Sequence, residues 1–187
     1  MQVEVTTWCL EMLQPSAVVA AGTPDLDLAL IRAKRPSAEH GRFLYTAVGG
    51  DWYWVDRLAW SPEDWLAWQA RTGVETWVAY VEGTPAGYFE LDGASGSEVE
   101  IAYFGLMPQF IGAGLGGWLL TRALVRAWEL GPRRVWVHTC SLDGPHALAN
   151  YEARGMRVYK VEKGHQELQP EPPWMPQDGG PTGSCAA

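Results

Sequence analysis

The sequence predicts an α/β domain in which helices flank a mostly antiparallel central sheet. Three β-patterned runs follow one another at 75–82, 86–92 and 98–107, separated by short turns, which is typical of consecutive antiparallel strands. A glycine-rich loop and the strongest amphipathic helix come next, and that helix ends at a glycine and a proline, residues 131 and 132. A short apolar strand follows at 134–139. Three antiparallel strands, a glycine-rich loop, a helix and a further strand, in this order, predict an α/β domain with helices against a mixed sheet.

The remaining elements follow from local signals. Alternating residues predict strands at 3–12 and 26–32, a helix is expected at 37–47, and Ser61 and Pro62 begin another that runs to about residue 71. A short helix at 145–154 and a strand at 156–163 complete the pattern. From residue 166 proline, glycine and polar residues predominate. We therefore expect a single domain at 1–165 and a flexible tail at 166–187.

Composition excludes several classes of protein. The chain has 187 residues, of which 47% are hydrophobic, so it can bury one core. Its 22 acidic and 14 basic residues give a formal charge of −8, which argues against a broad nucleic-acid-binding face. The three cysteines are scattered without the spacing of a disulfide framework or a zinc site, and no apolar run approaches ~20 residues. We expect a cytoplasmic protein with no metal and no membrane contact.

The glycine-rich loop predicts an anion site. Residues 112–117 hold four glycines, and they open the amphipathic helix. Backbone N–H groups and the helix dipole can bind a phosphate there without a lysine. A P-loop would require a lysine and a serine or threonine after the last glycine, whereas Trp118 and Leu119 follow it. A dinucleotide fingerprint would follow the first strand of a parallel βαβ unit, whereas this loop follows three antiparallel strands.

Two motifs in this order resemble the GNAT superfamily of acyl-CoA-dependent N-acetyltransferases. IGAGLG (111–116) is similar to the family's Arg/Gln-x-x-Gly-x-Gly/Ala loop, and ALANYEARGM (147–156) is similar to its A-I-x-L-Y-E-K-x-G-F segment. The likeness covers 74–163. It departs at Ile111, which stands where the family has arginine or glutamine; Gln109 fits only in a shifted register. The resemblance implies a mixed sheet with a splayed strand pair that holds acyl-CoA, and acceptor-side helices within 1–73.

The resemblance also implies a coenzyme site for acetyl-CoA. The backbone of Phe104 and Leu106 would pair with the pantetheine arm, and the N–H of Phe104 would polarise the thioester carbonyl. The pyrophosphate would lie over the loop, on Gly112, Ala113, Gly114, Leu115, Gly116 and Gly117.

Catalytic residues come from the same likeness. EIAYFGL resembles the strand of histone-acetylating members in which the leading glutamate, here Glu100, is the general base. Glu98 shares its strand face and Glu90 lies on the neighbouring strand, so both remain alternatives. Tyr151 matches the tyrosine that serves as general acid. Among residues near the sulfur, Asp143 receives no role.

A cysteine and a histidine near the end of the 134–139 strand suggest a less favoured alternative. His138 and Cys140 lie in HTCSLDGP, and a Cys–His pair can form a covalent acyl-enzyme. Thr139 separates the two, so no fixed contact between their side chains is expected.

The chain has eleven tryptophans, and five of them fall between residues 52 and 68. Trp60, Trp65 and Trp68 have a spacing that suits core packing. In the family, the loop before them forms a wall of the acceptor site. We expect Asp51, Trp52 and Trp54 to contact a small, cationic primary amine, because aromatic faces and carboxylates attract cations.

Two functions remain open at this point. The first is an enzyme that transfers an acetyl group to an amine. The second is a non-catalytic acyl-CoA-binding module, which the substitution at Ile111 favours. The expected partner is a small-molecule amine, with no nucleic acid; a homodimer is left open.

Overall fold

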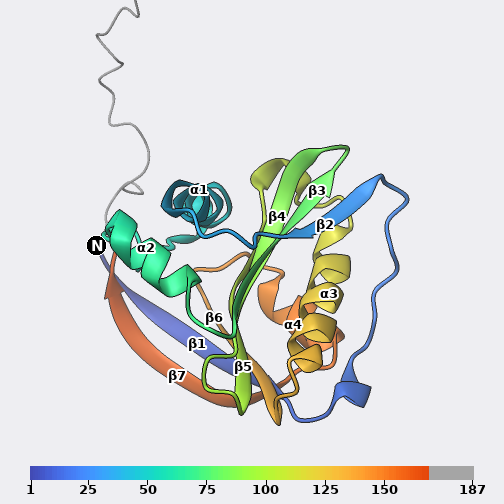
Figure 1. Ribbon diagram of the computed structural model, residues 1–187. Coiled ribbons are helices and arrows are strands. Elements are labelled where there is room, and N and C mark those ends of the chain that lie inside the picture. Colours follow the sequence, from blue (N-terminus) through green and yellow to red (C-terminus); the bar gives the residue numbers. More distant parts are fainter. Residues whose placement is uncertain (169–187) are drawn as a thin grey trace, which may run out of the picture.

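A seven-stranded mixed sheet forms the centre of the molecule, with helices on both faces (Figure 1). The structure, a computed structural model, describes residues 1–168. The strand order is β2-β3-β4-β5-β6-β1-β7. In chain order the elements are β1 (Gln2–Met12), η1 (Pro15–Ala17), β2 (Leu28–Arg32), α1 (Ala38–Gly49), η2 (Gly50–Trp52), α2 (Pro62–Gln69), β3 (Val74–Val81), β4 (Thr84–Asp92), β5 (Glu98–Leu106), η3 (Pro108–Phe110), α3 (Leu115–Glu129), β6 (Arg134–Cys140), α4 (Ala147–Ala153) and β7 (Arg157–Glu167).

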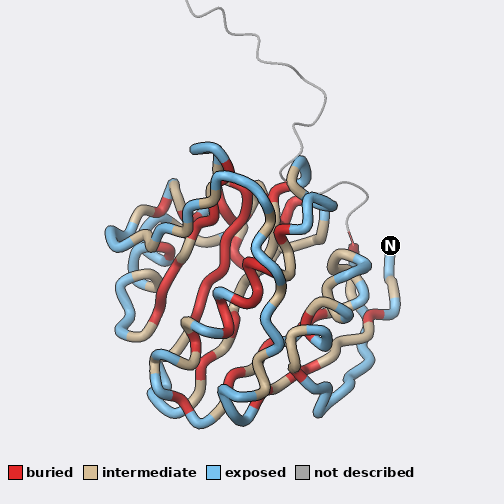
Figure 2. The backbone as a smooth tube through the Cα atoms, turned by 90° about the vertical axis from the view of Figure 1, so that its right-hand side faces the viewer, coloured by how far each residue is buried: buried red, intermediate tan, exposed pale blue. Residues whose placement is uncertain are grey.

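The two faces of the sheet carry separate cores. Helices α3 and α4 lie on one face, and α1 and α2 lie on the other (Figure 1). On the first face α3 buries Leu119, Leu120 and Leu124 completely against β4, β5 and β6. On the second face α1 packs Leu44 and Val48 against β3 and β4. The central strands are therefore buried, while the outer segments are exposed (Figure 2).

Helix ends follow the local sequence signals. The Ser61 hydroxyl accepts a hydrogen bond from the Asp64 amide, and the Asp64 carboxylate accepts one from the Ser61 amide, so α2 begins with a capping box. At the start of α1 the Ser37 hydroxyl accepts a hydrogen bond from the His40 amide, which makes Ser37 the N-cap. Because these caps depend on neighbouring residues, the sequence placed both helix starts within a residue.

The predicted splayed pair is confirmed at β5 and β6. These parallel strands pair from Glu98 with Arg134 to Glu100 with Trp136, and both continue beyond that point along diverging paths. A bulge in the β4–β5 ladder sets Ile101 opposite Leu91 and Tyr103 opposite Glu90. Bulges bend a strand and strengthen its twist, which assists the separation.

The position of the first strand was not predicted. β1 lies between β6 and β7 and is antiparallel to both. Alternation in a sequence identifies a strand but does not name its partners. β7 extends to Glu167, into the segment expected to be a tail. The rest of the expected tail, residues 169–187, lies outside the described residues.

Among residues 1–168, no helix combines the length and the apolar character that crossing a membrane requires.

Candidate active site

A cavity of about 750 Å³ opens where β5 and β6 separate. Its walls come mainly from the free ends of β5 and β6, the glycine loop, the turn and helix after β6, and the segment that follows α1. Val48 of α1 and Gln166 of β7 also line it. Of the residues predicted for the site, those that line it are Phe104, Leu106, Gly112, Gly114, Gly116, Gly117, Tyr151, Trp52 and Trp54. Most of the predicted site is thus brought together around one space.

The glycine loop leaves backbone donors directed at this cavity. Gly112 and Gly114 have φ of +89° and +77°, a conformation that a side chain strains. Gly114 is the N-cap of α3, and within the described chain no side chain caps this end. The first amides of a helix have no intrahelical acceptor, so they remain available to an anion. Ala113 is exposed outside the lining, and Leu115 is buried in the core.

A cation that the sequence analysis missed lies beside this loop. Ile111 is 48% exposed and brings no charge. The Arg154 guanidinium instead lies against the first turn of α3, since a Cβ on Gly117 would be 2.6 Å from its Nη1. The Arg154 Nε is buried and has no hydrogen-bond partner among the described residues. A positive charge thus adjoins the positive end of a helix, an arrangement that an anion would stabilise.

Tyr151 lies on α4, which is held to the loop by a 3.2 Å hydrogen bond from the Asn150 side chain to the Gly116 carbonyl. Its side chain lines the cavity, and the residue is only 5% exposed. Its ring packs against Phe104, with 6.0 Å between centroids. Burial raises the pKa of the Tyr151 phenol, so it holds its proton at neutral pH. A protonated phenol at the edge of a cavity can serve as a proton donor.

Glu100 lies behind a histidine rather than in the cavity wall. The His138 Nδ1 is 3.2 Å from the Glu100 Oε1, with side-chain exposures of 55% for the histidine and 21% for the glutamate. His138 lines the cavity, whereas Glu100 is not among the described lining residues. The hydrogen bond to Glu100 raises the pKa of His138 despite partial burial.

The two alternative carboxylates are occupied elsewhere. Glu98 forms an ion pair with Arg134 at 3.4 Å. Glu90 is buried, where it forms an ion pair with Arg57 at 2.8 Å and accepts a hydrogen bond from the Trp68 indole at 2.8 Å. Neither is among the described lining residues of the cavity.

The segment that follows α1, expected to form the acceptor-side wall, reaches across to the turn after β6. The Trp54 Nε1 donates a 3.4 Å hydrogen bond to Asp143 Oδ1, and the Trp52 ring lies against Gly144. The other Asp143 oxygen accepts from the Thr139 hydroxyl at 2.6 Å and from the Cys140 amide at 2.8 Å. These contacts fix a carboxylate at the cavity.

A second carboxylate of this wall is Asp56. Asp56 and Asp51 are both exposed, but only Asp56 is among the described lining residues of the cavity. The segment is held by the next residue, Arg57, which is 5% exposed. Its guanidinium carbon lies 4.5 Å from the Trp60 ring centroid and 4.3 Å from those of Trp68 and Tyr103. The clustered tryptophans therefore enclose a buried arginine.

A family comparison fits this geometry. The model of the acetyltransferase (GNAT) family matches residues 42–156, well over half of the chain. The chain belongs to the GNAT family. A comparison with curated proteins gave no match.

Solved GNAT structures share the fold. A GCN5-related N-acetyltransferase from Kribbella flavida aligns with a TM-score of 0.62 at 19% identity over 88% of this chain and 58% of that one. A GCN5-related N-acetyltransferase from Sphaerobacter thermophilus aligns with a TM-score of 0.63 at 18% identity, over 89% of this chain and 53% of that one. An aminoglycoside acetyltransferase from an uncultured soil metagenomic sample aligns with a TM-score of 0.56 at 17% identity, over 68% of this chain and 86% of that one. The chain thus spans little more than half the length of the first two.

Within this GNAT fold, the covalent alternative loses support. Burial and the nearby charge of Asp143 raise the pKa of the Cys140 thiol. A thiol with a raised pKa is a poor nucleophile at neutral pH, because the thiolate is the reactive form.

The GNAT motifs predicted the glycine loop and Tyr151, which both line the cavity, but they did not predict Arg154, Asp56 or the pairing of His138 with Glu100. Arg154 stands within the quoted 147–156 motif, so the available sequence signal was a basic residue in that motif. The pairing of His138 had no sequence signal, because it depends on where two strands begin to separate.

Proposed function

We propose that this GNAT protein transfers the acetyl group of acetyl-CoA to the primary amine of a small molecule by direct attack. One observation carries the proposal. A single cavity joins an anion-binding loop, a buried protonated tyrosine and a histidine backed by a carboxylate. These are the groups that acyl transfer to an amine requires.

The coenzyme would occupy the α3 side of the cavity. The amides at Gly112 to Gly117, except that of Ala113, which donates to the Phe110 carbonyl at 3.3 Å, would bind the pyrophosphate together with the Arg154 guanidinium. The pantetheine would run along the free part of β5 at Phe104 and Leu106, with the Phe104 N–H on the thioester carbonyl. In this chain a cation from the end of α4 would substitute for the arginine or glutamine missing at Ile111.

The reaction would need two proton transfers. As the amine nitrogen bonds to the carbonyl carbon, the pair formed by Glu100 and His138 would remove a nitrogen-bound proton. As the carbon–sulfur bond breaks, Tyr151 would give its proton to the leaving thiolate. Water would then restore both groups.

The acceptor would be a small cation that loses a proton on the enzyme. Trp52 and Trp54 present aromatic surface to the cavity, and Asp56 and Asp143 supply negative charge. Such a combination attracts an ammonium group and disfavours anionic acceptors. Asp51, exposed beyond the lining, would add only long-range attraction.

A thiol-release assay with acetyl-CoA and a panel of small amines tests the proposal. We expect amine-dependent release that favours cationic over neutral and anionic acceptors. Asp56→Asn should raise the acceptor KM about tenfold, or ~1.4 kcal/mol, with the acetyl-CoA KM unchanged. Asp51→Asn should change it less. Coenzyme binding without release for any amine would favour the non-catalytic alternative.

A further inference from the structure

We propose that His138 is the catalytic base, and that Glu100 is a positioning residue that acts through it. This inference rests on the proposed acetyl transfer. It differs from the expectation for Glu100, because it assigns the proton to an imidazole nitrogen rather than to a carboxylate oxygen.

The strand geometry separates the two residues. Glu100 and Trp136 form the last pair of the β5–β6 ladder, so Glu100 stands where the strands begin to diverge. His138 lies two residues further along β6, on the same face as Trp136, and therefore inside the opening. A substrate in the cavity would meet the imidazole before it met the carboxylate.

The contact between the two side chains defines the role of each. The His138 Nδ1 is 3.2 Å from the Glu100 Oε1, so in the neutral imidazole Nδ1–H donates to the carboxylate. The remaining ring nitrogen, Nε2, then carries the lone pair that accepts a proton. A hydrogen-bonded carboxylate fixes this tautomer and stabilises the imidazolium that forms.

The charged groups around His138 favour the same step. Glu100 faces it from β5, Asp143 from the turn after β6, and Asp56 from the acceptor-side wall; all three raise the pKa of His138. On its own strand, Arg134 is already paired with Glu11 and Glu98. The imidazolium would thus form among carboxylates, without an unpaired cation beside it on β6.

The step is balanced without any further reactant. The bound ammonium first gives one proton to water. The neutral amine nitrogen then forms a bond to the acetyl carbon, and a second proton moves from that nitrogen to the His138 Nε2. The carbon–sulfur bond breaks, and the thiolate takes the proton of Tyr151. His138 then releases its proton to water, and the Tyr151 phenolate takes a proton from water, so both groups return to their starting forms.

The test compares pH profiles of kcat/KM, with one amine throughout, for wild type, His138→Gln, Glu100→Gln and the control His165→Gln. His165 is exposed on the edge strand β7 and is not among the described lining residues; the next residue, Gln166, lines the cavity, but successive strand side chains point to opposite faces. His138→Gln should lower turnover by ~10²-fold and remove the acidic limb of the profile. Glu100→Gln should keep that limb but move it to lower pH, because His138 loses the carboxylate that raises its pKa. The control should match wild type.

Two further measurements guard against a folding artefact. In an NMR titration without substrate, the His138 signal, assigned by its loss in His138→Gln, should titrate at lower pH in Glu100→Gln. Added imidazole should restore part of the activity of His138→Ala, since the side chain is more than half exposed.

Loss of the acidic limb in Glu100→Gln, together with near-normal turnover in His138→Gln, would overturn the inference and return the base to Glu100. That outcome would leave the proposed function intact. If the wild type released no thiol, the proposed function itself would fail, whatever the titration showed.

Discussion

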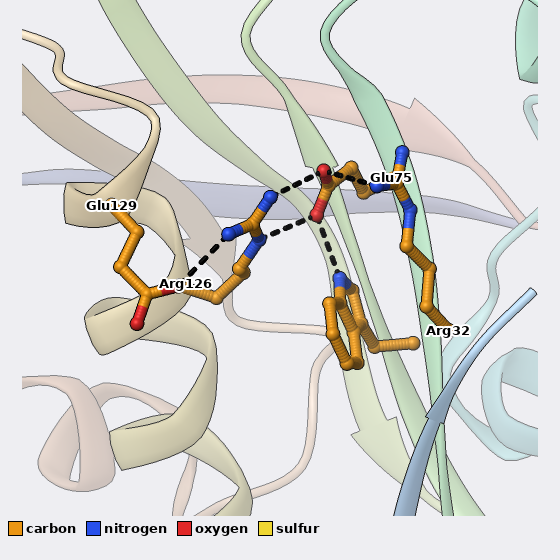
Figure 3. Close-up of polar contacts among 5 residues, drawn as sticks. Arg32, Glu75, Arg126 and Glu129 are labelled. Carbon is orange, nitrogen blue, oxygen red and sulfur yellow. Dashed lines mark hydrogen bonds and ion pairs between the residues drawn. The ribbon is translucent and has the colours of Figure 1, made fainter. Parts of the chain in front are cut away.

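Two buried glutamates on neighbouring strands show how differently the two faces of the sheet are held. Glu75 on β3 faces α3 (Figure 3), where Arg126 donates two 2.8 Å hydrogen bonds, the Trp77 indole donates a third at 2.8 Å, and Arg32 lies 2.9 Å away. Glu90 on β4 faces α2, and among the described residues its donors are Arg57 and the Trp68 indole.

The pKa values of the two carboxyls reflect this difference. Burial alone would raise both. For Glu75 the hydrogen bonds of Arg126 and Trp77 outweigh burial, and the pKa is lowered. For Glu90 burial outweighs Arg57 and Trp68, and the pKa is raised. The α3 face is thus held by two partly exposed arginines, whereas the α2 face depends on one buried ion pair next to Asp56.

The largest effect should come from breaking that pair. Glu90→Gln leaves the Arg57 cation buried and unpaired, which should lower the free energy of unfolding by ~3–5 kcal/mol. Glu75→Gln should cost about 1–2 kcal/mol, because its arginines can be hydrated. Urea denaturation of the two variants measures both changes in the free energy of unfolding. Equal changes would show that the two faces of the sheet are held in the same way.

Tyr151→Phe separates chemistry from binding on the coenzyme side. Removing the phenolic proton donor should reduce turnover by ~10²-fold. Acetyl-CoA affinity by calorimetry should stay constant, because the ring and its packing against Phe104 remain. Wild-type turnover in this variant would assign Tyr151 to packing alone.

A smaller effect is expected at the glycine loop. Gly114→Asp places a negative charge where a phosphate should approach, so acetyl-CoA affinity should fall at least about tenfold, or ~1.4 kcal/mol. Gly96→Asp is a matched control, because Gly96 also has positive φ and nothing within 4 Å of an added Cβ. Equal affinities in the two folded variants would refute the loop assignment.

The smallest effect concerns pH and the Glu75 cluster. A carboxyl with a lowered pKa in the folded state contributes stability above its ordinary value, near 4.3, and that contribution is lost as the pH falls through the lowered pKa. Wild-type stability should therefore fall on acidification below about pH 5. Glu75→Gln should show a flatter profile in denaturation series, and an identical slope would contradict the assignment.

Sequence reasoning recovered the features that neighbouring residues determine. Ser61 and Pro62 favour a helix start whatever the tertiary contacts, and the glycines at 112–117 can adopt positive φ in any loop. The GNAT motifs also located Tyr151.

It missed features that arise from non-local pairing. The β4–β5 bulge and the point at which β6 leaves β5 bring His138 to Glu100, and neither can be read from one strand alone. The insertion of β1 between β6 and β7 is of the same kind. The fold brings three separate segments to the cavity or to the loop beside it, and these segments carry Arg154, Asp56 and Asp143. Their proximity could not be predicted from any one segment.

The most direct test of direct acetyl transfer is a single-turnover experiment with acetyl-labelled acetyl-CoA, followed by intact mass measurement of the protein and analysis of the small molecules. With a cationic amine present, we expect all transferred label on the amine nitrogen and an unlabelled protein. Without the amine, the label should stay on the coenzyme. Label on Cys140, or coenzyme that is bound but never transferred to any amine, would contradict the account.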